Sequence, residues 1–201
     1  MAPIDLLASA LTLINVALIV RRSLWNYPFG LAAVAVSAVV FWRERLYSDV
    51  LLQGFFFAVQ FYGWWVWSRH RARDGGVSVA WLSWRQRGLA LGLTLTATVA
   101  WGALMHRLTD ASLPWWDAAN LMLSVAAQIL MSRRFGENWA LWIVVDVNAI
   151  GLYAAKGLAA FTFLYVVLTG LAIWGFLQWQ RDSRVAARAD VTGLGGGLND
   201  R

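Results

Sequence analysis

Apolar residues gather along the chain into seven long runs, which are separated by polar and basic segments. A helix that crosses a membrane needs about 20 apolar residues, or about 17 at the short end. We therefore predict seven membrane-spanning helices, of which the second and the fifth must include flanking residues to reach this length. The predicted spans are Ile4–Val20, Tyr27–Trp42, Tyr47–Trp67, Gly88–Met105, Ala118–Met131, Trp139–Ala155 and Leu158–Trp179.

The first three spans resemble the last three at an offset of 112 residues. The matches are Asp5 with Asp117, Arg21-Arg22 with Arg133-Arg134, Tyr62-Gly63 with Trp174-Gly175, Trp67 with Trp179 and, if two residues are inserted, Trp25 with Trp139. Four spans separate the two starting points, so both triplets cross the membrane in the same direction. Transporters built from such parallel repeats place their binding site at the repeat interface.

This repeat predicts an all-α integral membrane protein in which a fourth helix links two parallel three-helix repeats. The repeats occupy residues 1–67 and 108–180, and a basic cytoplasmic loop with the linking helix occupies residues 68–107. Residues 181–201 are predicted to form a disordered cytoplasmic tail. The tryptophans near span ends, which we expect to form an aromatic belt, are Trp25, Trp42, Trp67, Trp115, Trp116, Trp139 and Trp179.

Basic residues are distributed unevenly between the two sides of the membrane that seven spans create. Of the 17 Lys and Arg residues, 13 lie on the side of the C-terminus and 4 on the other side. Cytoplasmic segments of membrane proteins carry an excess of Lys and Arg. The charges therefore predict a cytoplasmic C-terminus and an N-terminus outside the cell. Because they lie between apolar runs, we interpret them as topology signals and expect no nucleic-acid partner.

The sixth predicted span carries a carboxylate on the same face as two tryptophans. Trp139, Trp142 and Asp146 share this face because residues i, i+3 and i+7 of a helix point the same way. A carboxylate inside a bilayer costs about 2.5–3.5 kcal/mol, which is normally tolerated only beside a water-filled cavity or a partner group. We therefore predict that this stripe is one wall of a binding site for a small aromatic solute.

Polar side chains on other spans also line up on single helical faces. The candidate binding residues among them are Asn120 and Gln128 on the fifth span, Gln53 and Gln60 on the third, and Tyr165 on the seventh. Such residues either hydrogen-bond between helices or line a cavity, and both alternatives stay open. Indole faces stack on planar rings, a carboxylate neutralises a cationic ring, and amides bind hydroxyl or carboxamide groups. A small aromatic cation with polar appendages fits this set.

The composition argues against several other functions. Apolar residues make up 60% of the chain and charged residues 14%, against about 45–50% and about 25% in a soluble domain. Cysteine is absent, and His70 and His106 are far apart in predicted polar loops, so we expect no metal site, catalytic residue or cofactor, and no enzyme. A membrane subunit without a solute would explain the spans but not the aligned acid and amides.

The motif Trp139-x-x-Trp142-x-x-x-Asp146 resembles the WxxWxxxN/D motif of the PnuC family of bacterial vitamin transporters, which are best known for nicotinamide riboside. Further segments that are similar to this family are Leu46-Tyr47-Ser48-Asp49-x-x-Leu52-Gln53, Tyr62-Gly63-Trp64-Trp65-x-Trp67, Ser124-x-x-Ala127-Gln128 and Lys156-Gly157 with Leu164-Tyr165. The resemblance covers about residues 1–180.

The resemblance implies a 3+1+3 helix arrangement similar to that of the SWEET sugar carriers. It also implies facilitated diffusion of a vitamin across a bacterial inner membrane, without ion or ATP coupling, and trapping of the solute by a cytoplasmic kinase. The last motif position is Asp146 rather than Asn, and some relatives resemble carriers of thiamine, riboflavin or deoxynucleosides. The identity of the solute therefore stays open among these compounds, as does the formation of a homo-oligomer.

Overall fold

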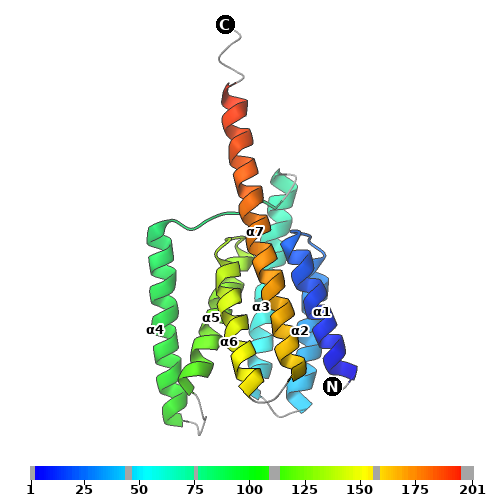
Figure 1. Ribbon diagram of the computed structural model, residues 1–201, viewed down its shortest axis with the longest axis vertical. Helices are drawn as coiled ribbons and strands as arrows, with labels where there is room; N and C mark the ends of the chain where they lie inside the picture. Colours follow the sequence, from blue (N-terminus) through cyan, green and yellow to red (C-terminus); the bar gives the residue numbers. More distant parts are fainter. Residues whose placement is uncertain (1–2, 44–46, 75–76, 109–113, 156–158, 196–201) are drawn as a thin grey trace.

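The computed structural model describes residues 3–43, 47–74, 77–108, 114–155 and 159–195, and these residues form a bundle of α-helices (Figure 1). Each predicted span coincides with one helix, although several helices extend beyond the predicted ends. The helices are α1 (Pro3–Val20), α2 (Asn26–Arg43), α3 (Tyr47–Asp74), α4 (Trp84–Leu108), α5 (Pro114–Ser132), α6 (Asn138–Ala155) and α7 (Ala159–Gly195).

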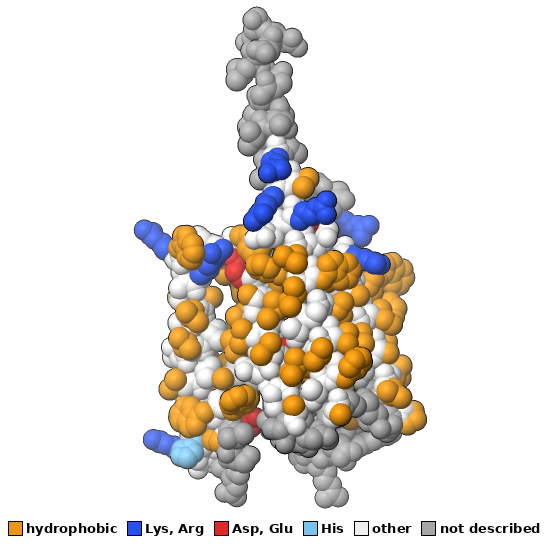
Figure 2. Space-filling view, in the orientation of Figure 1, with side chains coloured by type: hydrophobic (Ala, Val, Ile, Leu, Met, Phe, Trp, Pro, Cys, Tyr) orange, Lys and Arg blue, Asp and Glu red, His pale blue; other side chains and the backbone are white. Residues whose placement is uncertain are grey.

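Two helical stretches of the described chain are long and apolar enough to cross a membrane by themselves. They are Trp84–Leu108, with a mean hydropathy of 1.6, and Thr162–Ala186, with a mean hydropathy of 1.5. Leu6–Val20 and Asn26–Val40 are shorter apolar stretches. Apolar side chains cover the sides of the bundle, and most of the visible Lys and Arg side chains gather at the end where the C-terminal helix emerges (Figure 2). We call this end, which carries Arg21, Arg22, Arg133 and Arg134, the arginine-rich end.

The order of helix packing follows the predicted repeat. In the first triplet α2 packs against both α1 and α3, and in the second triplet α6 packs against both α5 and α7. The triplets meet through α1 with α7 and through α3 with α5, while α4 lies at the edge of the bundle and, among the described helices, packs against α5 alone (Figure 1). Exchanging the two triplets leaves the packing among their six helices unchanged, and α4 stands apart from it, which confirms the predicted 3+1+3 arrangement. The start of α1 and the end of α7 lie at opposite ends of the molecule (Figure 1).

The turns after α1 and α5 have the same backbone conformation and the same backbone hydrogen bonds. Arg22 and Arg134 both adopt the left-handed conformation, with φ of 53° and 68°. Each follows a helix end closed by the same pair of backbone bonds, Arg22 N to Ile19 O and Ser23 N to Leu18 O in the first triplet. The counterparts 112 residues later are Arg134 N to Met131 O and Phe135 N to Leu130 O. This is the Schellman arrangement, in which a left-handed residue satisfies the last carbonyls of a helix.

These turns correct one predicted match of the repeat. Asn26 and Asn138 each donate a side-chain hydrogen bond of 2.6 Å to the carbonyl three residues earlier, so the two repeats are in register without an insertion. Trp139 therefore corresponds to Tyr27 and not to Trp25. Exposure agrees, because Trp25 is 69% exposed whereas Tyr27 and Trp139 are 5% and 1% exposed.

The predicted aromatic belt is only partly correct. Trp25, Trp42, Trp115 and Trp116 are exposed on the sides of the bundle, as a belt requires. Three tryptophans that were assigned to the same belt, Trp67, Trp139 and Trp179, are instead fully buried. Hydropathy cannot separate the two environments, because an indole near a helix end suits both a membrane surface and a protein core.

The buried tryptophans and Tyr27 form what we call the four-ring cluster, which comprises Tyr27, Trp67, Trp139 and Trp179. Tyr27 meets Trp67 edge to face at 5.6 Å, and Trp139 meets Trp179 edge to face at 5.5 Å. Edge-to-face geometry is favourable for aromatic pairs at such distances. The cluster therefore repeats one contact in each triplet and sits where the triplets meet.

Helix ends also differ from two predicted boundaries. The tail predicted to be disordered from residue 181 continues as helix to Gly195, and the rest of it lies outside the described residues. Its alanines and arginines are strong helix formers, which explains the continuation. The predicted basic loop is shorter than expected, because α3 continues to Asp74 and α4 begins at Trp84. His70 and His106 accordingly lie in helices and not in loops.

Candidate functional site

A cavity of about 480 Å³ lies between the two triplets. Residues from α1, α2, α3, α5, α6 and α7 line it, and within the described chain α4 contributes none. The lining begins near Ser9, Gln53 and Asn120, early in their helices, and ends at the four-ring cluster towards the arginine-rich end. The volume falls in the range of about 300–1,000 Å³ that is typical of small-molecule sites.

The structure brings together every residue that the sequence predicted for the site. All of them line this one cavity, although they come from α3, α5, α6 and α7. They are Gln53, Gln60, Asn120, Gln128, Trp139, Trp142, Asp146 and Tyr165. Trp139 differs from the others in that it also belongs to the four-ring cluster, so its ring closes one end of the cavity.

Asp146 is the most distinctive group in the cavity. Its side chain is only 5% exposed, and no hydrogen bond or ion pair reaches its carboxylate from any residue that the structure describes. Described arginines pair elsewhere, Arg22 with Asp182 at 2.7 Å and Arg87 with Glu137 at 2.8 Å. A buried carboxylate without a partner is costly. Its position on the cavity wall therefore indicates a group that is completed by water or by a bound solute.

Hydroxyl groups near the cavity form bonds within their own helices. The Ser124 hydroxyl donates to Asn120 O and the Thr169 hydroxyl donates to Tyr165 O, each at 2.8 Å, so neither bond joins two helices. The side-chain oxygen of Asn120 is buried and lacks a donor among the described residues. No hydrogen bond within the described residues engages the side-chain amide of Gln128. Of the two alternatives left open by the sequence, these amides therefore favour cavity lining.

The two triplets share a backbone frame but present different chemistry to the cavity. At the repeat position of Trp142 the first triplet has Gly30, and at that of Asp146 it has Val34. A Cβ on Gly30 would collide with the amide oxygen of Gln60 and lie 2.6 Å from Asn15 Nδ2. The space that an indole takes in one triplet is therefore taken by two amides in the other. One wall can stack on a ring, and the opposite wall can form hydrogen bonds.

Sequence reasoning missed several lining residues of the first triplet. Asn15 lines the cavity and donates a hydrogen bond of 2.6 Å to Asn26 O, and Tyr27 closes the same end as Trp139. Ser9, Thr12 and Asn15 recur every three residues along α1, a signal that could have identified this face. Tyr27 could have been found from the repeat at its correct register.

Comparison with known proteins gives one consistent family. The family model described as nicotinamide mononucleotide transporter matches residues 2–181. The nicotinamide riboside transporter PnuC of Escherichia coli K12 is 33% identical over 184 residues, which cover 79% of this chain and 77% of that protein. The riboflavin/roseoflavin transporter RibM of Streptomyces davaonensis is 34% identical over 187 residues, which cover 90% and 87%. The crystal structure of the vitamin B3 transporter PnuC superposes with a TM-score of 0.75 at 27% identity, covering 89% of this chain and 80% of that one.

Proposed function

The chain belongs to the nicotinamide mononucleotide transporter family, and we propose that the solute it carries is nicotinamide riboside or a closely related vitamin. As a member of this family it is a multi-pass membrane transporter and not an enzyme. The resemblance to PnuC transporters that the sequence motifs indicated is confirmed.

The observation that carries the proposal is the buried carboxylate of Asp146, which has no partner among the described residues and shares a helical face with Trp142. The nicotinamide ring of the riboside is a planar cation. An indole attracts a cationic ring through its face, and a carboxylate attracts it more strongly where water is excluded. Together the two side chains would bind a cationic ring better than a neutral ring of the same shape.

Amide side chains from both triplets would supply the remaining contacts. Nicotinamide riboside carries ribose hydroxyls and a carboxamide, which both donate and accept hydrogen bonds. Asn15 and Gln60 from the first triplet, with Asn120 and Gln128 from the second, offer amide groups of both kinds. We assign the ring to the wall of Trp142 and the ribose to these four amides.

Riboflavin is a second candidate, because RibM is as similar to this chain as PnuC is. The isoalloxazine ring of riboflavin is neutral, so it would not benefit from the charge of Asp146. Thiamine, whose thiazolium ring is cationic, would benefit. Uptake of labelled nicotinamide riboside into proteoliposomes, with unlabelled riboflavin and thiamine as competitors, separates these solutes. No uptake of labelled nicotinamide riboside above that of protein-free liposomes would overturn the proposal.

We further infer the direction and the driving force of transport. The excess of Lys and Arg at the arginine-rich end supports a cytoplasmic C-terminus and an N-terminus outside a bacterial inner membrane. We propose facilitated diffusion without ion or ATP coupling, in which a cytoplasmic kinase traps the solute as its phosphate. Uptake into proteoliposomes should then stop at equal concentrations inside and outside, and should continue when a kinase and ATP are enclosed.

A further inference from the structure

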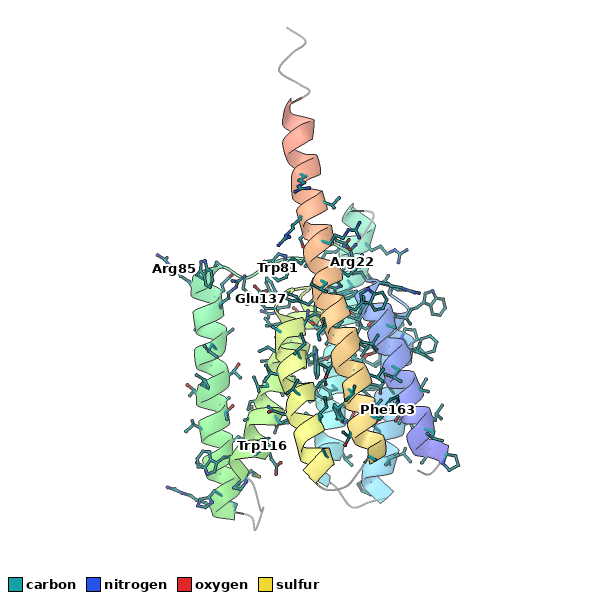
Figure 3. The ribbon with its side chains drawn as sticks, viewed as in Figure 1. Arg22, Trp81, Arg85, Trp116, Glu137 and Phe163 are labelled. Atoms are coloured by element: carbon teal, nitrogen blue, oxygen red, sulfur yellow. The ribbon has the colours of Figure 1, made fainter. Side chains whose placement is uncertain are left out.

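Residues 77–83, which we call the strap, cross the arginine-rich end of the bundle between α3 and α4 (Figure 1). Although the strap lacks helical structure, it is held at many points. Val77 is 5% exposed and packs in the same buried cluster as the four rings. Figure 3 shows Trp81 close to Glu137 at this end, with Arg22 on the other side of α7. The strap therefore lies over the four-ring cluster, which in turn closes the cavity.

Two arginines from equivalent positions of the two triplets bind adjacent residues of the strap. Arg22 donates a hydrogen bond of 3.0 Å to Val77 O, and Arg134 donates bonds of 2.7 Å and 2.8 Å to the carbonyl and hydroxyl of Ser78. Both arginines occupy left-handed positions that L-residues rarely adopt. One short segment is thus bound at neighbouring carbonyls by both halves of the transporter.

The rest of the strap is attached mainly to the second triplet. Ala80 pairs with the turn after α5, accepting a bond of 2.9 Å from Gly136 N and donating one of 3.0 Å to Arg134 O. The Trp81 indole donates to the Ser183 hydroxyl of α7 at 3.0 Å and covers Gly136 so closely that a Cβ there would lie 2.5 Å from the ring. On the side of the first triplet the strap follows α3 in the chain, and its described non-covalent contacts there are the bond from Arg22 and the packing of Val77.

Transport by parallel repeats involves movement of one triplet against the other around the site. Opening the cavity at the arginine-rich end would separate the four-ring cluster and carry the turns at Arg22 and Arg134 apart. A strap that is held by both turns opposes that separation. Each hydrogen bond to a charged group contributes substantially to such a closed state.

We propose that the strap is a latch that keeps the cavity closed at the arginine-rich end, and that it opens when Val77 leaves Arg22 while residues 80 and 81 stay on the second triplet. The latch depends on the transporter function of the chain and not on the identity of its solute. Arg22 does not line the cavity, so its proposed role is to control access to the cavity and not to bind the solute.

The test measures access to the cavity without any solute, so its failure would leave the proposed solute untouched. The chain has no cysteine, so Ser37→Cys introduces a single thiol on the cavity wall. A membrane-impermeant thiol reagent is added from the side of the C-terminus, in vesicles of known orientation. Arg22→Gly is then introduced, because glycine keeps the left-handed turn while it removes the guanidinium.

Arg22→Gly removes both the bond to Val77 O and the ion pair with Asp182, so it should raise the labelling rate from that side about tenfold above Asp182→Ala, which removes the ion pair alone. Arg21→Gly is the matched control, since it removes a neighbouring exposed charge that does not bind the strap, and it should leave the rate unchanged. Equal labelling rates in the Arg22→Gly and Arg21→Gly proteins would overturn the latch. If Arg22→Gly does not accumulate, Val77→Ala weakens the same attachment and should change the rate in the same direction; an unchanged rate would again overturn it.

Discussion

Trp67 of the first triplet and Trp179 of the second contact each other with their ring centroids 6.0 Å apart and their planes at 52°. The two residues occupy the same position of the repeat, so the contact joins a residue to its own counterpart. Parallel repeats are related by an axis along the membrane normal, and such a contact lies on that axis. Any movement of one triplet against the other must therefore change this ring pair, of which Trp67 lines one end of the cavity.

The charge of Asp146 should distinguish cationic from neutral solutes. Asp146→Asn keeps the shape and the hydrogen-bonding oxygen of the side chain but removes the charge. Binding of nicotinamide riboside should weaken about tenfold, which corresponds to about 1.4 kcal/mol of lost attraction. Binding of neutral riboflavin, if measurable, should change much less. Calorimetric titration of the purified protein gives both dissociation constants, and an equal loss for the two solutes would show that the charge has no role in recognition.

The same carboxylate should reduce the stability of the solute-free protein. Asp146 is buried without a partner among the described residues, so an apolar side chain of similar size should fit its site at lower cost. We expect Asp146→Leu to raise the free energy of unfolding by about 1 kcal/mol or more while it abolishes transport. Asp117→Leu is the control, because Asp117 is exposed in the first turn of α5, where a negative charge is favourable. Thermal unfolding in detergent measures both, and a lower midpoint for Asp146→Leu would contradict the prediction.

Trp142 should contribute to affinity through the face of its ring. Trp142→Ala removes the stacking surface, and we expect binding of nicotinamide riboside to weaken about tenfold or more. Trp142→Phe keeps an aromatic face and should recover much of the affinity. Direct binding measurements distinguish this role from a packing role, because a packing residue would lower the unfolding midpoint in both variants without a selective loss of binding in the alanine variant.

The absence of a side chain at Gly30 should determine where the amides of Gln60 and Asn15 lie. Gly30→Ala pushes the Gln60 amide and Asn15 from their positions. Because Gln60 is flexible and can move, the loss of stability should be small, while binding of the solute weakens severalfold. The experiment compares the change in unfolding midpoint with the change in dissociation constant of the solute. A large loss of stability with unchanged affinity would mean that the two amides support the fold and do not contact the solute.

Most of the candidate site could be predicted from the sequence because polar groups inside apolar runs are strong signals. In a membrane protein, side chains such as those of Asp146 and Gln128 are rarely exposed to lipid and usually face the interior of the bundle or a cavity. The strap could not be predicted, since the bonds from Arg22 and Arg134 to its carbonyls join residues 55 and 56 positions apart and no side-chain pattern marks a carbonyl.

The register of the repeat was predicted incorrectly for a different reason. Trp25 was matched to Trp139 because the residue type is the same, whereas the fold pairs Trp139 with Tyr27. The side-chain caps of Asn26 and Asn138, which fix where α2 and α6 begin, carry more positional information than the identity of one aromatic residue. Tyr27 and Trp139 differ in ring type, but each faces a glycine at the equivalent repeat position, Gly63 or Gly175.

Those facing glycines give the last prediction. Gly63 and Gly175 occupy the same repeat position, and an added Cβ would lie 2.9 Å from the Tyr27 hydroxyl in one triplet and 2.6 Å from the Trp139 ring in the other. Both rings are buried and cannot move freely, so Gly175→Ala should destabilise the protein by about 1–3 kcal/mol, and Gly63→Ala by a similar or smaller amount. Gly170→Ala on the same helix α7 meets no atom within 4 Å and should be neutral or stabilising, because alanine favours helix over glycine. Thermal unfolding of the three variants tests this order. If Gly175→Ala unfolds no earlier than Gly170→Ala, the four-ring cluster is loosely packed, and it could not close the cavity as the structure indicates.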